Sequence, residues 1–147
     1  MKKYTMSVMA GISLFTGILV TGCFKNKDNS PPPSPNGKFD GEFSVLKKRS
    51  AGTGYDTVVR DTIRLTLNPD SGFRVTGDTT RHAGSHGSYI YDYYYISFDD
   101  ETYSTASSKY HLNNLYAYYY DGAIFQLARG SSGDTLRLQY DLRKAAN

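Results

Sequence analysis

The chain has 147 residues, a formal net charge of +3 at pH 7, 14 tyrosines and one cysteine. A single cysteine excludes a disulfide within the chain. The basic residues are scattered along the sequence, which argues against a nucleic-acid partner because nucleic-acid binding requires a concentrated basic footprint.

Residues 1–22 have the pattern of a secretory signal peptide. Lys2 and Lys3 precede an apolar run over residues 6–20. Such a run is typical of a signal peptide and is shorter than the roughly 20 predominantly apolar residues of a membrane-spanning helix. Removing residues 1–22 takes both lysines away and leaves a formal net charge of +1, from 15 basic and 14 acidic residues.

The apolar run ends in Val20-Thr21-Gly22-Cys23, which resembles the lipobox of bacterial lipoproteins. The resemblance implies cleavage after Gly22, a diacylglyceryl group on the Cys23 sulfur and acylation of the new amino terminus. The resemblance also implies that the protein is located in the bacterial cell envelope. Phe24 stands where an aspartate retains some lipoproteins at the inner membrane, so the outer membrane is favoured. Two or more acyl chains anchor a protein stably, at about 0.8 kcal/mol per buried methylene.

Residues 23–37 are predicted to form a lipidated tether. Four of the five prolines lie in this segment, and its stretch from Lys25 to Gly37 is not expected to contribute to an apolar core. Proline-rich linkers extend at about 3.1 Å per residue, so that stretch would hold the following domain on the order of 40 Å from the membrane.

Residues 38–147 are predicted to form a single all-β domain. Apolar and polar residues alternate there with a period of two, which is typical of strands that bury one face. The clearest stretches are residues 39–45, 63–67, 73–75 and 136–142.

The segments between these strands carry turn sequences. Residues 68–72 place proline at the second position of a type I turn and glycine at a left-handed position. Asp121-Gly122 is a two-residue hairpin signal that would put Tyr120 opposite Ala123, and residues 130–133 make the last hairpin loop. Consecutive hairpins predict an antiparallel meander of about eight strands. Such a meander must close into a barrel or fold over itself to bury its apolar face.

The order of these elements resembles the small lipocalin-like domains of Bacteroidetes-type lipoproteins. The segments that carry the likeness are Gly37-Lys38-Phe39, residues 67–73, Gly87-Ser88-Tyr89, Ile96-Ser97-Phe98 and residues 133–138. The likeness covers most of the domain. It implies a lipocalin-like antiparallel barrel or half-barrel.

One group of tyrosines is predicted to face the interior of the barrel. An eight-stranded barrel is just wide enough either to be filled by side chains or to hold one small ligand. Apolar walls with a few hydroxyl tips suit a small apolar or amphipathic ligand. The leading functional hypothesis is therefore a non-catalytic lipoprotein that binds such a ligand, with a filled interior as the alternative. The residues predicted to hold the ligand are Tyr116, Tyr118, Tyr120 and Phe125, with Ala123 and Leu127 on the same face.

A second tyrosine segment is predicted to present an outward row. The residues of this segment predicted to face inward are Ile90, Tyr94, Ile96 and Phe98. Those predicted to form the outward row are Tyr91, Tyr93 and Tyr95. Such a row could dock a glycan or another envelope protein, because tyrosine joins a large apolar ring to a hydrogen-bonding tip. Alternatively, the tyrosines simply pack across strands on a half-buried surface.

The histidines do not predict a metal site. His82 and His86 lie in a glycine-rich segment that is predicted to be a flexible polar loop. A zinc site requires three or four protein ligands, and His111 is the only other histidine.

Neither the acidic residues 99–101 nor the serines near His86 form a pattern that predicts catalysis. Residues 99–101, Asp-Asp-Glu, are predicted to form a solvated turn at a strand end. Ser85 and Ser88 lie close to His86 in sequence, but the G-x-S-x-G elbow of hydrolases is absent. The sequence therefore predicts no catalytic residue, no metal and no cofactor.

Overall fold

The computed structural model describes residues 33–131 and 133–146. Eight β-strands run through this part of the chain, which contains no helix; accordingly, none of its segments is a helix capable of crossing a membrane. The strands are β1 (Gly37–Lys48), β2 (Tyr55–Asn68), β3 (Gly72–Gly77), β4 (Ser85–Tyr91), β5 (Tyr95–Asp100), β6 (Asn114–Tyr120), β7 (Ile124–Arg129) and β8 (Leu136–Lys144).

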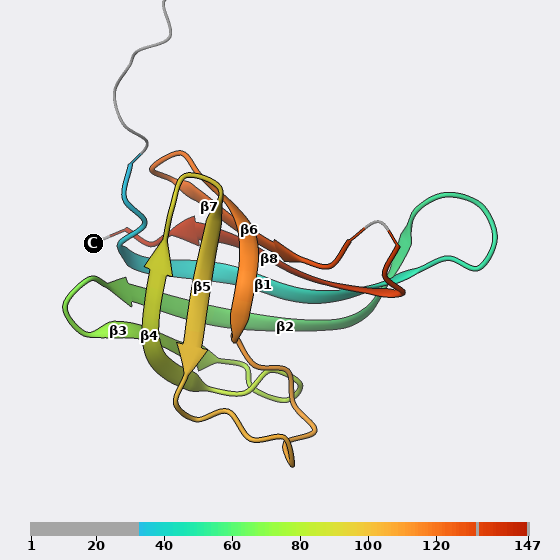
Figure 1. The fold of residues 1–147 in the computed structure, drawn as a ribbon, viewed down its shortest axis with the longest axis horizontal. Coiled ribbons are helices and arrows are strands. Elements are labelled where there is room, and N and C mark those ends of the chain that lie inside the picture. The colour runs from blue at the N-terminus through green and yellow to red at the C-terminus, as the bar shows by residue number, and fades with distance from the viewer. Residues whose placement is uncertain (1–32, 132, 147) are drawn as a thin grey trace, which may run out of the picture. The chain divides into compact units, whose positions relative to one another are not determined.

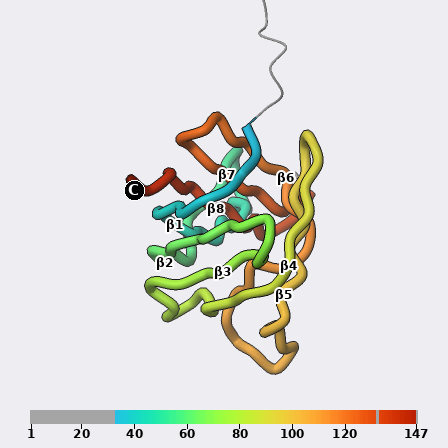
Figure 2. The backbone as a smooth tube through the Cα atoms, turned by 90° about the vertical axis from the view of Figure 1, so that its left-hand side faces the viewer, coloured from blue at the N-terminus to red at the C-terminus, as the bar shows by residue number. Residues whose placement is uncertain are grey.

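The strands form a closed antiparallel barrel (Figure 1). Each strand pairs with the next one along the chain, and β8 returns to pair with β1 from Phe39↔Lys144 to Lys47↔Leu136. Closure leaves no unpaired sheet edge among these strands. The predicted all-β meander of about eight strands is therefore confirmed, and of the barrel and the half-barrel the closed form is observed. Figure 2 shows the β4–β5 hairpin rising along one side of the barrel, across the direction of β1, β2 and β3.

Side chains fill the interior of the barrel. Alternate residues of the strands point inward and form one continuous buried apolar cluster. Aromatic rings meet edge to face within it, with centroids 5.0 Å apart for Phe73 and Phe98 and 5.7 Å apart for Tyr116 and Tyr140. Such contacts add to the stabilisation that burial of the rings provides. Of the two states predicted for an eight-stranded barrel, the filled one is observed.

The β6–β7 hairpin has a different register from the predicted one. Tyr120 pairs with Phe125 rather than lying opposite Ala123. The cause is Asp121, whose carboxylate accepts hydrogen bonds from the backbone N–H groups of Ala123 and Ile124 at 2.8 and 2.7 Å and so stabilises a longer loop. The register differs by an even number of residues, so the side chains keep their faces. Tyr116, Tyr118, Tyr120, Phe125 and Leu127 still share one face, as predicted, whereas Ala123, which was predicted to join them, lies exposed in the loop.

The predicted inward position of Ile90 and Tyr94 is wrong, because these side chains are 75% and 66% exposed. The chain turns between β4 and β5 at Asp92. The Asp92 carboxylate accepts hydrogen bonds from the backbone N–H groups of Tyr94 and Tyr95, each with an N···O distance of 2.8 Å. An aspartate can organise a turn in this way without glycine or proline. The other two residues predicted to face inward, Ile96 and Phe98, are buried.

Ordered contacts begin inside the segment predicted as a tether. Pro35 is buried, and its carbonyl accepts a hydrogen bond from the Tyr89 hydroxyl at 3.4 Å. The predicted signal peptide, the acylated Cys23 and the tether up to residue 32 lie outside the described residues.

Candidate functional site

Exposed apolar and aromatic side chains gather on β4, β5, β6 and the turn between β4 and β5. We call this surface the tyrosine face; its members are Ile90, Tyr91, Tyr93, Tyr94, Tyr95 and Leu115. Strand pairing assembles it, since Ser97 pairs with Ile90 on one side and with Leu115 on the other. Ser97 is small, and a hollow of about 150 Å³ lies beside it. The β4–β5 turn stands at the top of the barrel in Figure 1.

Tyr91 lies at the rim of the barrel. It pairs with the buried Ile96, so its side chain leaves β4 on the inner side of the sheet. Its ring stacks on Tyr89 at 6.2 Å between centroids and meets Tyr118 edge-on at 6.5 Å. Tyr91 is therefore exposed, as predicted, but it does not belong to an outward row on one strand face.

Tyr93 and Tyr95 occupy two other positions. Tyr93 lies in the turn, where its ring meets that of Tyr94 at 4.8 Å between centroids. Tyr95 is the first residue of β5 and faces outward, paired with Ala117. The three predicted docking tyrosines are all exposed, but Tyr91 is on β4, Tyr93 is in the turn and Tyr95 is on β5, so they do not form a row on one strand face.

Hydrogen bonds hold this hairpin in place. The Tyr118 hydroxyl donates to the Asp92 carbonyl at 2.7 Å, and the Tyr118 backbone N–H donates to the Tyr94 carbonyl at 3.1 Å. Burial raises the pKa of Tyr118, so its hydroxyl keeps the proton that it donates. The Asp92 carboxylate has a lowered pKa because the N–H groups of Tyr94 and Tyr95 stabilise its charge. The tyrosine face is thus presented on a preorganised turn.

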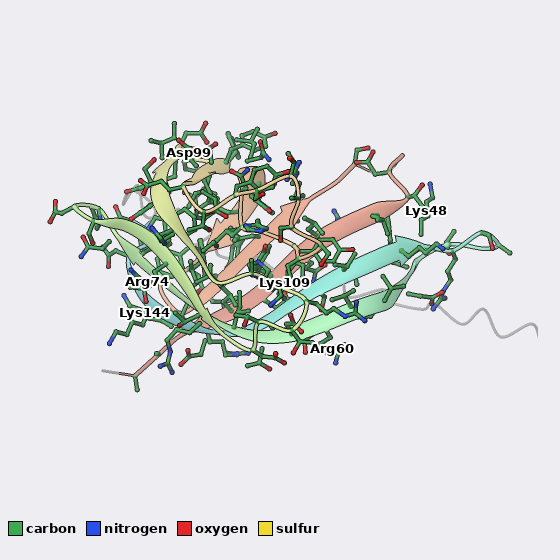
Figure 3. The ribbon with its side chains drawn as sticks, turned by 90° about the horizontal axis from the view of Figure 1, so that it is seen from below. Lys48, Arg60, Arg74, Asp99, Lys109 and Lys144 are labelled. Atoms are coloured by element: carbon green, nitrogen blue, oxygen red, sulfur yellow. The ribbon has the colours of Figure 1, made fainter. Side chains whose placement is uncertain are left out.

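Some charged side chains lie on other parts of the barrel. Arg60 on β2, Arg74 on β3 and Lys144 on β8 project from a different side than Asp99 on β5 (Figure 3). Arg64 forms an exposed ion pair with Asp40 at 2.6 Å, which lowers the pKa of Asp40. Asp92 lies in the turn of the tyrosine face itself and Asp99 lies two residues after Ser97 on β5, so this surface is not free of charge.

The predicted interior ligand residues pack against other side chains. Tyr116, Tyr120 and Phe125 are buried, and Tyr118 is partly buried near the rim. The Tyr120 ring meets Phe125 edge-on at 5.7 Å between centroids. Two hollows on the described surface lie outside the barrel wall, over β2–β4 and over β6–β8, and a third lies at the end of the barrel where β1 begins and β2 ends.

A buried polar network was missed by sequence reasoning. His82, predicted to lie in a flexible polar loop, is fully buried, so that prediction is wrong. Its Nδ1 lies 2.7 Å from the Ala83 carbonyl, which can only accept, so Nδ1 carries the proton. Nε2 then accepts from the Tyr140 hydroxyl at 2.8 Å. The Asp61 carboxylate accepts hydrogen bonds from the backbone N–H groups of Arg81 and His82.

Electrostatics agree with this arrangement. Burial lowers the pKa of His82 to about 4, so its imidazole is neutral at pH 7 and can accept a hydrogen bond. Burial also raises the pKa of Tyr140 well above its usual value, so its hydroxyl is a permanent donor. The network fastens the segment before β4 to the barrel core.

Asp100 and His111 form a second buried pair. Asp100, predicted to be part of a solvated turn, is buried. Its carboxylate lies 2.7 Å from His111 Nδ1. The carboxylate also accepts hydrogen bonds from the backbone N–H and the hydroxyl group of Thr102, at 2.8 and 2.6 Å. The prediction is wrong for Asp100, whereas its neighbours Asp99 and Glu101 are exposed. The pair ties residues 101–113 to the end of β5, at the bottom of the barrel in Figure 1.

The Ser85 hydroxyl and the His86 side chain lie in different surroundings. The Ser85 hydroxyl is buried and has no hydrogen-bond partner among the described residues, so it is not activated by a histidine. His86 is on the surface, 3.9 Å from Glu101. Within residues 33–131 and 133–146, no three His, Cys, Asp or Glu side chains converge in a way that could hold a metal ion.

Comparisons with protein-family models, with curated proteins and with solved structures found no match. The class that the fold defines is a closed eight-stranded antiparallel β-barrel with a filled interior. The likeness to lipocalin-like lipoproteins stays a prediction from the sequence.

Proposed function

We propose that this chain is a non-catalytic lipoprotein of the bacterial outer membrane, held there by acyl groups on Cys23, that docks another envelope protein through its tyrosine face. The observation that carries the docking role is the gathering of six exposed apolar or aromatic side chains on β4, β5, β6 and the β4–β5 turn of a barrel whose interior is already full.

The composition of the tyrosine face favours a protein partner over a glycan. Ile90 and Leu115 offer no hydrogen bonds to sugar hydroxyls, but they suit the apolar centre of a protein interface. Tyrosine is enriched in such centres and charged residues are depleted. The one carboxylate that lines the hollow belongs to Asp92, and it already accepts hydrogen bonds from two backbone N–H groups.

Preorganisation supports the same role. Binding normally costs about 0.5–1.5 kcal/mol for each long side chain that must be immobilised. Here Tyr118 and Asp92 fix the turn before any partner arrives, and Tyr93 and Tyr94 already contact each other. A larger share of the contact energy is thus available for affinity.

The hypothesis of a ligand inside the barrel has weaker support. Tyr116, Tyr120 and Phe125 are buried against neighbouring rings. A ligand would have to displace those contacts, which are worth about 0.5–1.5 kcal/mol per aromatic pair beyond the burial of the rings.

Site-specific photo-crosslinking in the host bacterium tests the docking proposal. A photoreactive residue replaces Tyr93 in the full-length chain, and in a matched control it replaces Val58, which is exposed on β2. We expect one discrete adduct with an envelope protein at position 93 and none at position 58. The double substitution Ile90→Asp and Leu115→Asp should remove that adduct.

Three results would contradict the proposal. The first is equal adducts at positions 93 and 58, and the second is an adduct that persists in the double variant. The third is an adduct with the mass of two copies of this chain, which would make the tyrosine face a self-association surface.

A further inference from the structure

A groove over β6, β7 and β8 differs in chemistry from the tyrosine face. It has a volume of about 280 Å³. Its floor consists of Ala117 and Ala128, which pair with each other across β6 and β7. Methyl groups cover the sheet only thinly, so the surface is hollowed there. Tyr119, 54% exposed, lies in the next outward row and supplies an aromatic wall.

Polar side chains in fixed orientations line the groove beside Tyr119. Gln126 pairs across the strands with Tyr119 on one side and with Asp141 on the other. The Asp141 carboxylate accepts from Gln126 Nε2 at 2.8 Å and from Gln139 Nε2 at 2.7 Å. Each glutamine still has its amide oxygen and a second N–H for other partners. Asp141 thus acts as a positioning residue for two amides.

Arg137 adds a cationic group to the same groove. Its Nε is buried and has no hydrogen-bond partner among the described residues. Its guanidinium lies 5.9 Å from the centroid of the Tyr55 ring, which holds the side chain near the sheet. Arginine presents five donors in a planar fork, so this group can receive oxygen acceptors from a ligand.

We propose that this groove binds a neutral saccharide. A sugar ring has an apolar C–H face, which can pack on the Tyr119 ring. It also has hydroxyl groups, which both donate and accept and so match the amides of Gln126 and Gln139. The charges of Arg137 and Asp141 cancel, which favours an uncharged ligand.

The fold disfavours other occupants of this groove. An extended peptide binds most readily by adding a strand to an open sheet edge, and the closed barrel offers none among its eight strands. A lipid chain would meet two glutamines, an aspartate and an arginine. The volume lies just below the range of about 300–1,000 Å³ typical of drug-sized ligands and is suited to one or two sugar rings.

Binding of the full lipidated chain to an array of neutral and acidic oligosaccharides tests the proposal. The protein is kept in a zwitterionic detergent, because a sugar-based detergent would compete for the groove. We expect binding to at least one neutral oligosaccharide. Tyr119→Ala should weaken this binding by about tenfold or more, the usual size of losing a central aromatic contact. Tyr119→Phe should retain it.

Two further variants separate the groove from the rest of the surface. Ala128→Leu fills the floor and should abolish binding, with unchanged thermal unfolding showing that the barrel is intact. The tyrosine-face variant Tyr93→Ala should bind the saccharide normally. A failure of the docking proposal would therefore leave the saccharide result unaffected, and the reverse also holds.

The proposal is overturned if no neutral oligosaccharide binds. It is also overturned if only acidic saccharides bind, or if Tyr119→Ala and Ala128→Leu both bind as well as the unaltered chain.

Discussion

Asp61 and His82 show how single residues secure the end of the barrel. Asp61 lies in phase with the inward-facing Ile63 and Leu65 of β2, so it meets the interior as a carboxylate. Two backbone N–H groups compensate its burial, one of them from His82. A buried carboxylate in this position is tolerated because these two donors are directed at it.

His82 should make the stability of the chain depend on pH. Its pKa is about 4 in the folded state and near 6.5 when it is exposed in the unfolded chain. Between these values the unfolded chain binds a proton that the folded chain does not bind. The free energy of unfolding therefore falls as pH drops from 6.5 to 4, by up to about 3 kcal/mol.

Urea denaturation at several pH values measures this dependence. The variant His82→Gln should show a shallower decline of stability over the same range, whereas His86→Gln, on the surface, should behave like the unaltered chain. An identical decline in His82→Gln would show that another group is responsible.

At the scale of strands, β4 depends on a glycine where neighbouring backbones approach closely. A Cβ atom on Gly87 would lie 1.9 Å from the Asp99 carbonyl oxygen of β5. Backbone cannot give way as a flexible side chain can. Gly87 also pairs with Phe73 of β3, so the close approach sits between two hydrogen-bonded neighbours.

Gly87→Ala should destabilise the barrel by about 3 kcal/mol, because β4 must move away from β5. Gly84→Ala is the matched control, since the nearest atom to its Cβ would be 3.4 Å away, an ordinary contact. Thermal unfolding of both variants measures the difference. Equal melting temperatures for the two variants would contradict the close approach.

The strand elements were partly predictable from local pattern. Period-two alternation located β1, β2, β3 and β8, because one buried face per strand produces it directly. The turn at Asp92 could not be located this way, since aromatic residues continue on both sides of it and no glycine or proline interrupts them. The β6–β7 register depended on Asp121 side-chain hydrogen bonds, which the Asp-Gly pair alone does not reveal.

For the molecule as a whole, a filled barrel predicts that no small molecule is retained in its interior. Native mass spectrometry of the purified full-length chain should give the mass of the acylated polypeptide alone, because the interior residues already contact one another. A small molecule bound in one-to-one ratio, and lost on Tyr116→Ala, would favour the interior-ligand hypothesis instead.

The proposed attachment of the whole molecule to the membrane depends on one atom, the sulfur of Cys23. Cys23→Ala should abolish acylation and release the chain from the membrane fraction, because the acyl chains supply the membrane affinity. Fractionation of cells with metabolic labelling by a fatty-acid analogue measures both effects. Label and membrane association that persist in Cys23→Ala would refute the lipobox assignment.

Among the site residues, those of the tyrosine face were partly predictable. The exposure of Tyr91, Tyr93 and Tyr95 agrees with the prediction, but their arrangement around a turn does not. The sequence predicts exposed positions for His82 and Asp100, because polar residues near glycines or turns usually face solvent. Asp61 and Asp100 both continue the inward phase of their strands, and that was the available signal of burial.

By itself the sequence determined the all-β class, the antiparallel meander and the inner face of β6, because alternation and even-numbered register shifts are local properties of a pleated chain. Closure of β8 onto β1, the filled interior, the buried His82 and Asp100 and the groove beside Tyr119 were decided only by tertiary structure. Each of these depends on atoms that lie far apart in the chain and meet only when the barrel closes.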